Sequence, residues 1–128
     1  MNKKIIWGVG AVVVIGLVVW LMMTPGKPGK LDTFATCLKD SGTKFYGAFW
    51  CVHCQKQKAM FGKSAGLLPY IECSTPNSKG TLQVCKDAKI EGYPTWILAD
   101  GTRLPNEGTA GVSLETLAEK TSCVLPSV

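Results

Sequence analysis

The amino end of the chain carries one unbroken apolar segment. From Ile5 to Met23 there are 19 residues without a charge, and 16 of them are apolar. As a helix this segment would rise about 28 Å, close to the ~30 Å hydrocarbon thickness of a bilayer. Trp7 and Trp20 lie near its ends, where indole rings favour the membrane interface. We predict that residues 5–23 form a transmembrane anchor.

A cleaved signal sequence is the alternative interpretation of the same segment. The apolar part of a signal sequence usually has about 7–15 residues and is followed by small residues at a cleavage site. The segment here is longer, and residues 21–25 (LMMTP) contain no Ala-x-Ala pattern, which favours the anchor. Lys3 and Lys4 precede the segment, so we expect residues 1–4 to stay in the cytoplasm and the remainder to be exported.

Beyond a proline- and glycine-rich linker at residues 24–30, the chain alternates between helical and strand patterns. Apolar positions at helical spacing predict helices over residues 31–40, 55–68, 81–89 and 113–120, the last capped by Ser113. Short runs with strand character predict strands over residues 44–49, 69–73, 95–99 and 102–104. This order predicts one α/β domain over residues 31–128, with a mostly parallel sheet, helices on both faces and an antiparallel strand added by the final hairpin.

The excess of positive charge is concentrated next to the apolar segment. The chain has 128 residues and a formal net charge of +5. Four of its 14 basic residues are Lys3, Lys4, Lys27 and Lys30, so residues 31–128 carry 10 basic and 9 acidic groups, a net charge of +1. This balance lacks the basic patch that is typical of nucleic-acid-binding proteins. We therefore expect no nucleic-acid partner.

Cys51 and Cys54 form a Cys-x-x-Cys motif between a predicted strand and a predicted helix. Residues three apart at the start of a helix project from the same side, which brings the two sulfurs within reach of a disulfide. At that position free N–H groups and the positive end of the helix dipole stabilise a thiolate, the reactive form of cysteine. His53 adds positive charge when it is protonated. The motif predicts a redox-active pair with a reactive thiol at Cys51.

Other sites that use these residue types do not fit the spacing. A c-type haem site needs Cys-x-x-Cys-His, but Gln55 follows Cys54. A zinc site usually draws ligands from a second Cys-x-x-Cys or a histidine pair, and the sequence has neither. His53 is two residues from Cys51, a poor spacing for a Cys–His hydrolase dyad on a helix. We expect no metal and no cofactor, and a structural disulfide is the remaining alternative to a redox pair.

Two segments together resemble the thioredoxin fold family. Residues 49–54 (FWCVHC) are followed at residues 92–95 by GYPT, directly before a predicted strand. With FYGAFWC at residues 45–51 and with Cys73 and Cys85, the chain more narrowly resembles the thioredoxin-like domain associated with bacterial vitamin K epoxide reductase homologues. The resemblance implies a thioredoxin-like α/β fold with a central mixed sheet and helices on both faces.

This resemblance also implies roles for the residues of the motif. Cys51 would be the exposed nucleophile and Cys54 the buried resolving thiol, with His53 and Trp50 modulating their reactivity. Phe45 stands six residues before Cys51, where thioredoxin has a buried acid. The proton of Cys54 would then pass to water, to a lysine such as Lys56, or to the substrate. Val52 replaces a proline of many oxidising relatives, so the redox potential cannot be copied from them.

A second segment completes the expected site. By the same resemblance Pro94 would follow a cis peptide bond beside the cysteine pair, and the Tyr93 backbone would bind substrate as a short strand edge. Cys73 and Cys85 would form a structural disulfide. Among the nearby aromatic residues, we expect Phe49 and Trp96 to pack in the core.

The remaining cysteines are Cys37, in the first predicted helix of the domain, and Cys123, just beyond the last. In a thioredoxin fold those two helices usually cover opposite faces of the sheet, so we doubt that these cysteines pair and we expect two disulfides in total. Cys37 is then either a small core residue or an exposed thiol able to dimerise. Persisting disulfides favour the periplasm or an equivalent lumen.

These features predict a single-pass protein of the cell inner membrane, with a periplasmic or luminal thiol-disulfide oxidoreductase domain. His53, the missing acid and the resemblance favour an oxidant. It would introduce disulfides into exported cysteine-containing proteins and be reoxidised by a quinone-coupled membrane oxidase resembling vitamin K epoxide reductase. An anchored reductase or isomerase is one alternative. A non-catalytic binding module on a thioredoxin scaffold is another, because a fold alone does not determine a function.

Overall fold

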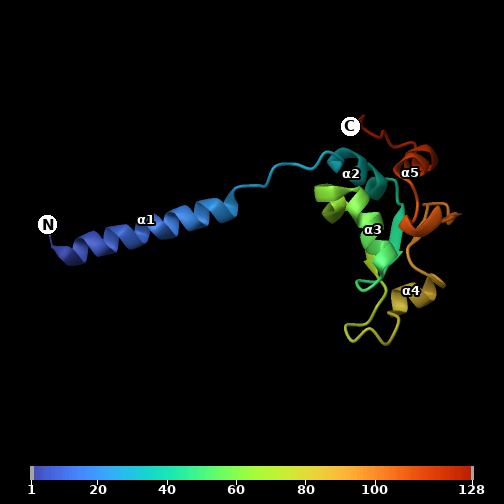
Figure 1. Cartoon of the computed structure of the whole chain (residues 1–128), viewed down its shortest axis with the longest axis horizontal. Helices are drawn as coiled ribbons and strands as arrows, with labels where there is room; N and C mark the ends of the chain where they lie inside the picture. The colour runs from blue at the N-terminus through green and yellow to red at the C-terminus, as the bar shows by residue number, and fades with distance from the viewer. Residues whose placement is uncertain (1, 128) are drawn as a thin grey trace.

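A computed structural model describes residues 2–127. Met1, in the expected cytoplasmic tail, and Val128, at the end of the expected domain, lie outside the described residues. Helix α1 (Lys3–Met23) extends away from the folded part of the chain, to which an extended segment joins it (Figure 1). None of its residues is buried, and its hydropathy of 2.6 makes it long and apolar enough to cross a membrane. Such a helix near the amino end fits both a membrane anchor and a signal sequence.

The folded part contains four further α-helices, two short 3-10 helices and four strands within the described residues. The helices are α2 (Asp32–Asp40), α3 (Val52–Met60), η1 (Gly62–Leu67), α4 (Gln83–Asp87), η2 (Gly108–Ala110) and α5 (Leu114–Thr121). The strands are β1 (Lys44–Gly47), β2 (Tyr70–Glu72), β3 (Thr95–Ile97) and β4 (Arg103–Leu104). The helix predicted over residues 55–68 begins earlier and divides at Gly62, whose positive φ of 54° ends the α-helical turn.

The sheet has the strand order β2-β1-β3-β4 and is mixed. Strand β1 pairs in parallel with β2 and antiparallel with β3, and β3 pairs antiparallel with β4. The mostly parallel sheet expected from the alternation is therefore wrong, whereas the central mixed sheet and the helices on both faces that the resemblance implied are observed. After α4 the chain returns beside β1 in the opposite direction, and the alternation of helices and strands along the sequence does not specify that direction.

The two faces of the sheet carry separate apolar clusters. Successive strand residues point to opposite faces, so Phe45 and Tyr46 enter different clusters. Phe45 stacks on Trp96 of β3 with ring centroids 4.6 Å apart, and helices α2, α3 and α5 contribute to this larger cluster. On the other face, Tyr46 packs with Cys73 and Cys85, next to α4. Trp96 lies in the core as predicted.

Helices α2 and α5 lie on the same face, which corrects our expectation for their cysteines (Figure 1). Cys37 and Cys123 form a disulfide, with Cα atoms 5.8 Å apart. Both helices bury leucines, Leu38 and Leu117, in the larger cluster, so the placement on opposite faces that made the pairing doubtful does not occur. Ser122, with a left-handed φ of 60°, ends α5 and returns the chain toward α2.

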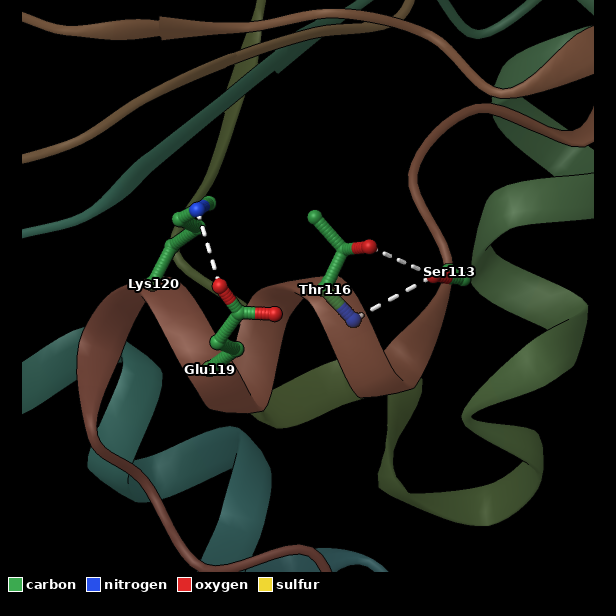
Figure 2. Close-up of polar contacts among 4 residues, drawn as sticks. All are labelled: Ser113, Thr116, Glu119 and Lys120. Carbon is green, nitrogen blue, oxygen red and sulfur yellow. Dashed lines mark hydrogen bonds and ion pairs between the residues drawn. The ribbon is translucent and has the colours of Figure 1, made fainter.

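Helix α5 begins with the predicted cap. The Ser113 hydroxyl oxygen accepts a hydrogen bond from the Thr116 backbone N–H at 3.2 Å and lies 2.9 Å from the Thr116 hydroxyl (Figure 2). Glu115 lies in the first turn, where a negative charge favours the helix dipole. Near the other end, Lys120 forms an ion pair with Glu119 at 2.9 Å on the exposed side of the helix.

Candidate active site

The Cys-x-x-Cys motif stands at the junction between the central strand and helix α3. Cys51 is the N-cap of α3, with an extended backbone conformation, and its sulfur accepts the backbone N–H of Cys54 at 3.4 Å. The Cys51 N–H itself donates to the carbonyl oxygen of Ala48 at 3.0 Å, which forms the turn out of the strand. The Cys51 sulfur therefore occupies the capping position at the positive end of the α3 dipole, as the sequence predicted.

The two thiols differ in their access to solvent. The expectation that Cys51 is exposed is wrong, because both thiols are buried: Cys51 is 7% exposed and Cys54 1%, so Cys51 is only the outer of the two. Burial raises the pKa of the Cys54 thiol from 9.0 to about 12, although the Ala48 backbone N–H and the Lys58 charge act in the opposite direction. Cys54 thus keeps its proton throughout the physiological pH range unless a neighbouring group accepts it.

The loop before β3 closes over the outer thiol. The Tyr93–Pro94 peptide bond is cis, as the resemblance implied. The Cys51 sulfur lies 3.8 Å from the carbonyl oxygen of Tyr93, and the Asn106 side chain donates a hydrogen bond to the Pro94 carbonyl at 3.1 Å. The structure thus brings Tyr93 and Pro94 to the cysteine pair. Their role in binding substrate stays a prediction.

Exposed apolar side chains form a rim around Cys51, and we define this apolar rim as Phe49, Trp50 and Val52. Their exposed fractions are 48%, 49% and 60%. The expectation that Phe49 packs in the core is wrong, because the strand ends before it and the turn into α3 directs it outward. The Trp50 indole N–H donates to the Ser74 hydroxyl at 2.8 Å, and its ring packs edge-on against Tyr93.

Two polar side chains fix α3 against the segment before α5. The exposed His53 ring has its Nδ1 2.6 Å from the carbonyl oxygen of Thr109. Gln57 is fully buried: its side-chain oxygen accepts the N–H of Val112 at 2.7 Å and the Trp96 indole N–H at 3.1 Å, and its amide donates to the Val112 carbonyl at 2.9 Å. Sequence reasoning missed Gln57, although its position three residues after Cys54 indicates the same buried side of the helix.

A second cluster that the sequence did not reveal lies next to Cys54. The Tyr70 hydroxyl donates to a carboxylate oxygen of Glu72 at 2.8 Å, and the Lys58 ammonium lies 3.4 Å from the centre of the Tyr70 ring. Burial first, and then the hydrogen bond to Glu72, raise the pKa of Tyr70, so the phenol is protonated. Lys56 is exposed on another side of α3. The lysine beside this cluster is Lys58, which its spacing of four residues from Cys54 could have indicated.

The opposite face of the sheet holds the Cys73–Cys85 disulfide, the pairing that the resemblance implied. Its Cα atoms are 5.5 Å apart and both cysteines are fully buried. The Cys73 N–H donates to the carbonyl oxygen of Gly47, at the end of β1, and the neighbouring Ser74 accepts the Trp50 hydrogen bond. The bridge thus holds a loop that touches the apolar rim.

Across residues 2–127, no group of three or more His, Cys, Asp or Glu side chains is arranged to hold a metal ion. The chemistry that the described geometry offers is that of two neighbouring thiols. The outer, capping sulfur can form a mixed disulfide with another protein, and the inner sulfur is placed to displace it.

Comparisons with known proteins agree with this chemistry. No family model matches the chain. Over 67 residues the chain is 54% identical to the thiol-disulfide oxidoreductase LTO1 of Arabidopsis thaliana, a match that covers 49% of this chain and 18% of that protein. Over 83 residues it is 35% identical to the thioredoxin domain-containing protein 5 homolog of Drosophila melanogaster, covering 58% of this chain and 19% of that protein.

The chain spans about a fifth of the length of these two curated relatives, so the comparison concerns one segment of each. Both names describe thiol chemistry or the thioredoxin domain, and the mixed sheet with helices on both sides is consistent with that fold. The similarities and the fold together support a thioredoxin-like α/β protein with a thiol-disulfide redox activity.

Proposed function

We propose that this protein is a membrane-anchored thiol-disulfide oxidoreductase whose Cys51–Cys54 pair exchanges with cysteines of exported proteins. One observation carries the proposal: the Cys51 sulfur caps helix α3, beside the Tyr93 carbonyl, with the inner thiol of Cys54 three residues further on. The N-terminal end of a helix stabilises a thiolate, and the cysteine after it completes a two-step exchange.

As an oxidant, the pair begins as a disulfide. A substrate thiolate attacks the Cys51 sulfur, the Cys51–Cys54 bond breaks, and Cys54 leaves with the electron pair and takes up a proton. A second substrate thiolate then attacks the substrate sulfur of the mixed disulfide, which releases Cys51 as a thiolate. The substrate gains a disulfide, and its two electrons stay on the Cys51–Cys54 dithiol.

For the cell, we propose that this dithiol is reoxidised by a quinone-coupled membrane oxidase resembling vitamin K epoxide reductase. The Cys37–Cys123 and Cys73–Cys85 disulfides support an oxidising compartment, because such bonds persist outside the reducing cytosol. Phe45, fully buried against Trp96, leaves no carboxylate at the position of the thioredoxin acid.

Residues 5–23 are proposed as the anchor, residues 1–4 as a cytoplasmic tail and residues 24–30 as the linker to a periplasmic or luminal domain. The full exposure of α1 supports the anchor over a buried core helix. A single span of this length fits the inner membrane of a cell with an oxidising compartment on its far side.

Substrate binding is proposed at the apolar rim and at the Tyr93 backbone. The rim exposes about half of each aromatic side chain next to Cys51, and Tyr93 presents its main chain before the buried Pro94. An extended cysteine-containing segment can pair with such an edge through main-chain hydrogen bonds while its apolar side chains contact the rim.

A reductase or isomerase is the second candidate, and the buried Cys54 favours it. A thiol with a pKa raised to about 12 is a poor leaving group, which slows the oxidising direction of exchange. The equilibrium of the pair with glutathione separates the two directions. A potential near about −270 mV would indicate a thioredoxin-like reductant, and one near about −120 mV a strong oxidant.

The catalytic assignment is tested by oxidation of a dithiol peptide with the full chain in detergent or lipid, with oxidised glutathione supplied to restore the Cys51–Cys54 disulfide. We expect Cys51→Ser to abolish turnover and Cys54→Ala to accumulate mixed disulfides with exported proteins on Cys51, while Lys56→Gln leaves turnover unchanged. Turnover that survives Cys51→Ser would overturn the proposal. A wild-type chain that neither turns over nor traps a partner would favour the binding module.

A further inference from the structure

Burial makes it difficult for the Cys54 thiol to lose its proton. The thiol is 1% exposed and must lose its proton before it can attack a mixed disulfide on Cys51. Its burial raises its pKa to about 12, so bulk water at neutral pH is a poor acceptor. Phe45, the neighbouring strand residue, offers no polar atom, and Lys56 is exposed elsewhere. A nearer acceptor is therefore needed.

The ionisable groups that act on Cys54 come from two elements. Helix α3 supplies Cys51 and Lys58, whose charges act directly on the Cys54 thiol. Strand β2 supplies Tyr70, whose side chain borders the space at Gly47 together with the Cys54 thiol, and Glu72, which accepts the Tyr70 hydrogen bond. From the segment after β1, only the backbone N–H of Ala48 contributes.

The space next to Gly47 is bordered by both the Cys54 thiol and the Tyr70 side chain. A Cβ atom placed on Gly47 would lie 2.9 Å from the Cys54 sulfur, 2.8 Å from the Tyr70 ring and 3.4 Å from the Tyr70 hydroxyl. Contacts below 3.0 Å are closer than a real Cβ accepts, so only glycine leaves this space open. The thiol and the phenol thus border one small space at the end of β1.

Glu72 is held in place by its own hydrogen bonds. One carboxylate oxygen accepts the backbone N–H of Ser74 at 2.8 Å and that of Phe49 at 3.3 Å. The other accepts the Tyr70 hydroxyl at 2.8 Å. Since the Tyr70 proton already points at the carboxylate, the phenol oxygen keeps a lone pair to accept a further proton. The Lys58 cation over the ring offsets the negative charge of the carboxylate nearby.

We propose that Tyr70 and Glu72 form the proton relay of Cys54, taking the place of the acid that is missing at Phe45. This inference rests on the proposed function and names the proton acceptor of its resolving step. Glu72 is the terminal acceptor, Tyr70 passes the proton, and Lys58 positions the ring and balances the charge.

In the reducing direction Cys54 resolves the mixed disulfide that Cys51 has formed with a substrate. The Cys54 sulfur forms a bond to the Cys51 sulfur, the bond from Cys51 to the substrate sulfur breaks, and the substrate leaves as a thiolate with the electron pair. The Cys54 proton moves to the Tyr70 oxygen while the Tyr70 proton moves to Glu72, which becomes a carboxylic acid and later releases the proton to solvent. In the oxidising direction the same proton returns to Cys54 as it leaves.

The test separates the two thiol steps with dithiobis-nitrobenzoate and the reduced full chain. Attack by Cys51 releases the first coloured thiolate, and attack by Cys54 on the resulting mixed disulfide releases the second. We expect Glu72→Gln and Tyr70→Phe to slow the second release about 100-fold at neutral pH and to leave the first unchanged. Glu72→Gln keeps an oxygen for the Ser74 N–H, and Lys56→Gln is the matched control that alters neither phase.

Two further readouts exclude a merely structural effect. In Glu72→Gln the second phase is expected to accelerate about tenfold per pH unit between about pH 6 and pH 8, because it now depends on direct ionisation of Cys54, whereas the wild-type rate varies much less. Added imidazole should accelerate the second phase in Glu72→Gln alone. An unchanged second phase in both variants would overturn the relay. Loss of the first phase in the wild type would instead overturn the proposed function.

Discussion

Two of the three cysteine pairs lie on opposite sides of the short central strand β1, and they differ in almost everything except burial. Cys51 and Cys54 lie at the start of a nine-residue helix, under an exposed aromatic rim and a cis-proline loop. Cys73 and Cys85 join a strand end to a five-residue helix and have no exposed surface. The reactivity that we propose for the first pair therefore rests on the backbone around its outer sulfur, because burial does not distinguish the two pairs.

The Cys37–Cys123 disulfide, like Cys73–Cys85, is a structural bridge outside the motif. Its removal should have the largest effect on stability. It closes the longest loop, with a sequence separation of 86 residues, for which the loop-entropy model gives about 4–5 kcal/mol. We expect the Cys37→Ala, Cys123→Ala double variant to lose that much free energy of unfolding in denaturant titrations. Peptide turnover per folded molecule should be unchanged, with Thr36→Ala as the control.

The Cys73–Cys85 disulfide should contribute less, because its cysteines are only 12 residues apart. The same model gives about 3 kcal/mol for a loop of this length. The Cys73→Ala, Cys85→Ala double variant is expected to unfold at lower denaturant and to keep turnover once folded. A loss of turnover as complete as that of Cys51→Ser would contradict a purely structural role for this disulfide.

A smaller expected effect, on the pH dependence of stability, also distinguishes the motif cysteines from the bridged ones. The pKa of Cys54 is about 12 in the folded state and 9.0 ordinarily, so the folded protein holds this proton more tightly than the unfolded chain does. Its contribution to stability is complete below pH 9 and is lost as the pH rises toward 12, because only the unfolded state ionises in that range.

The measurement compares Cys51→Ser, which keeps a thiol at Cys54, with the Cys51→Ser, Cys54→Ala double variant. We expect the melting temperature of the first to fall more steeply above pH 9, by a few degrees, whereas the bridged cysteines, which do not titrate, contribute nothing to either curve. Parallel curves for the two variants would contradict the burial of this thiol.

Local patterns predicted the elements that depend on near neighbours in the chain. The Ser113 cap and the capping position of Cys51 follow from a few adjacent residues, and both are observed. The Cys37–Cys123 pairing and the mostly parallel strand directions expected from the alternation were predicted wrongly, because each depends on which face or direction a distant segment takes, whereas the mixed sheet that the resemblance implied is observed. Helical and strand periodicity carry no information about that choice.

The same distinction holds within the candidate site. Sequence reasoning missed Lys58 and Gln57, but both share the side of α3 that carries Cys54, so helical spacing alone could have indicated them. Tyr70 lies near the thiol, with Glu72 bonded to its hydroxyl, only because β2 pairs in parallel with β1, with Phe45 opposite Tyr70 and Gly47 opposite Glu72. No spacing in the sequence specifies that register, and the pair therefore emerged from the structure.

The attachment of the linker limits where the outer thiol can work. The Thr24 hydroxyl bonds back to α1, and the chain from Gly29 to Leu31 is fixed to α2 and η1 by bonds to Asp32 and Ser64. Residues 25–28 then form the flexible part of the linker, which spans about 14 Å at full extension. With α1 in a bilayer, as proposed, the domain would stay close to the lipid surface. The local concentration of Cys51 would then be high for membrane-embedded partners and for chains just emerging from export.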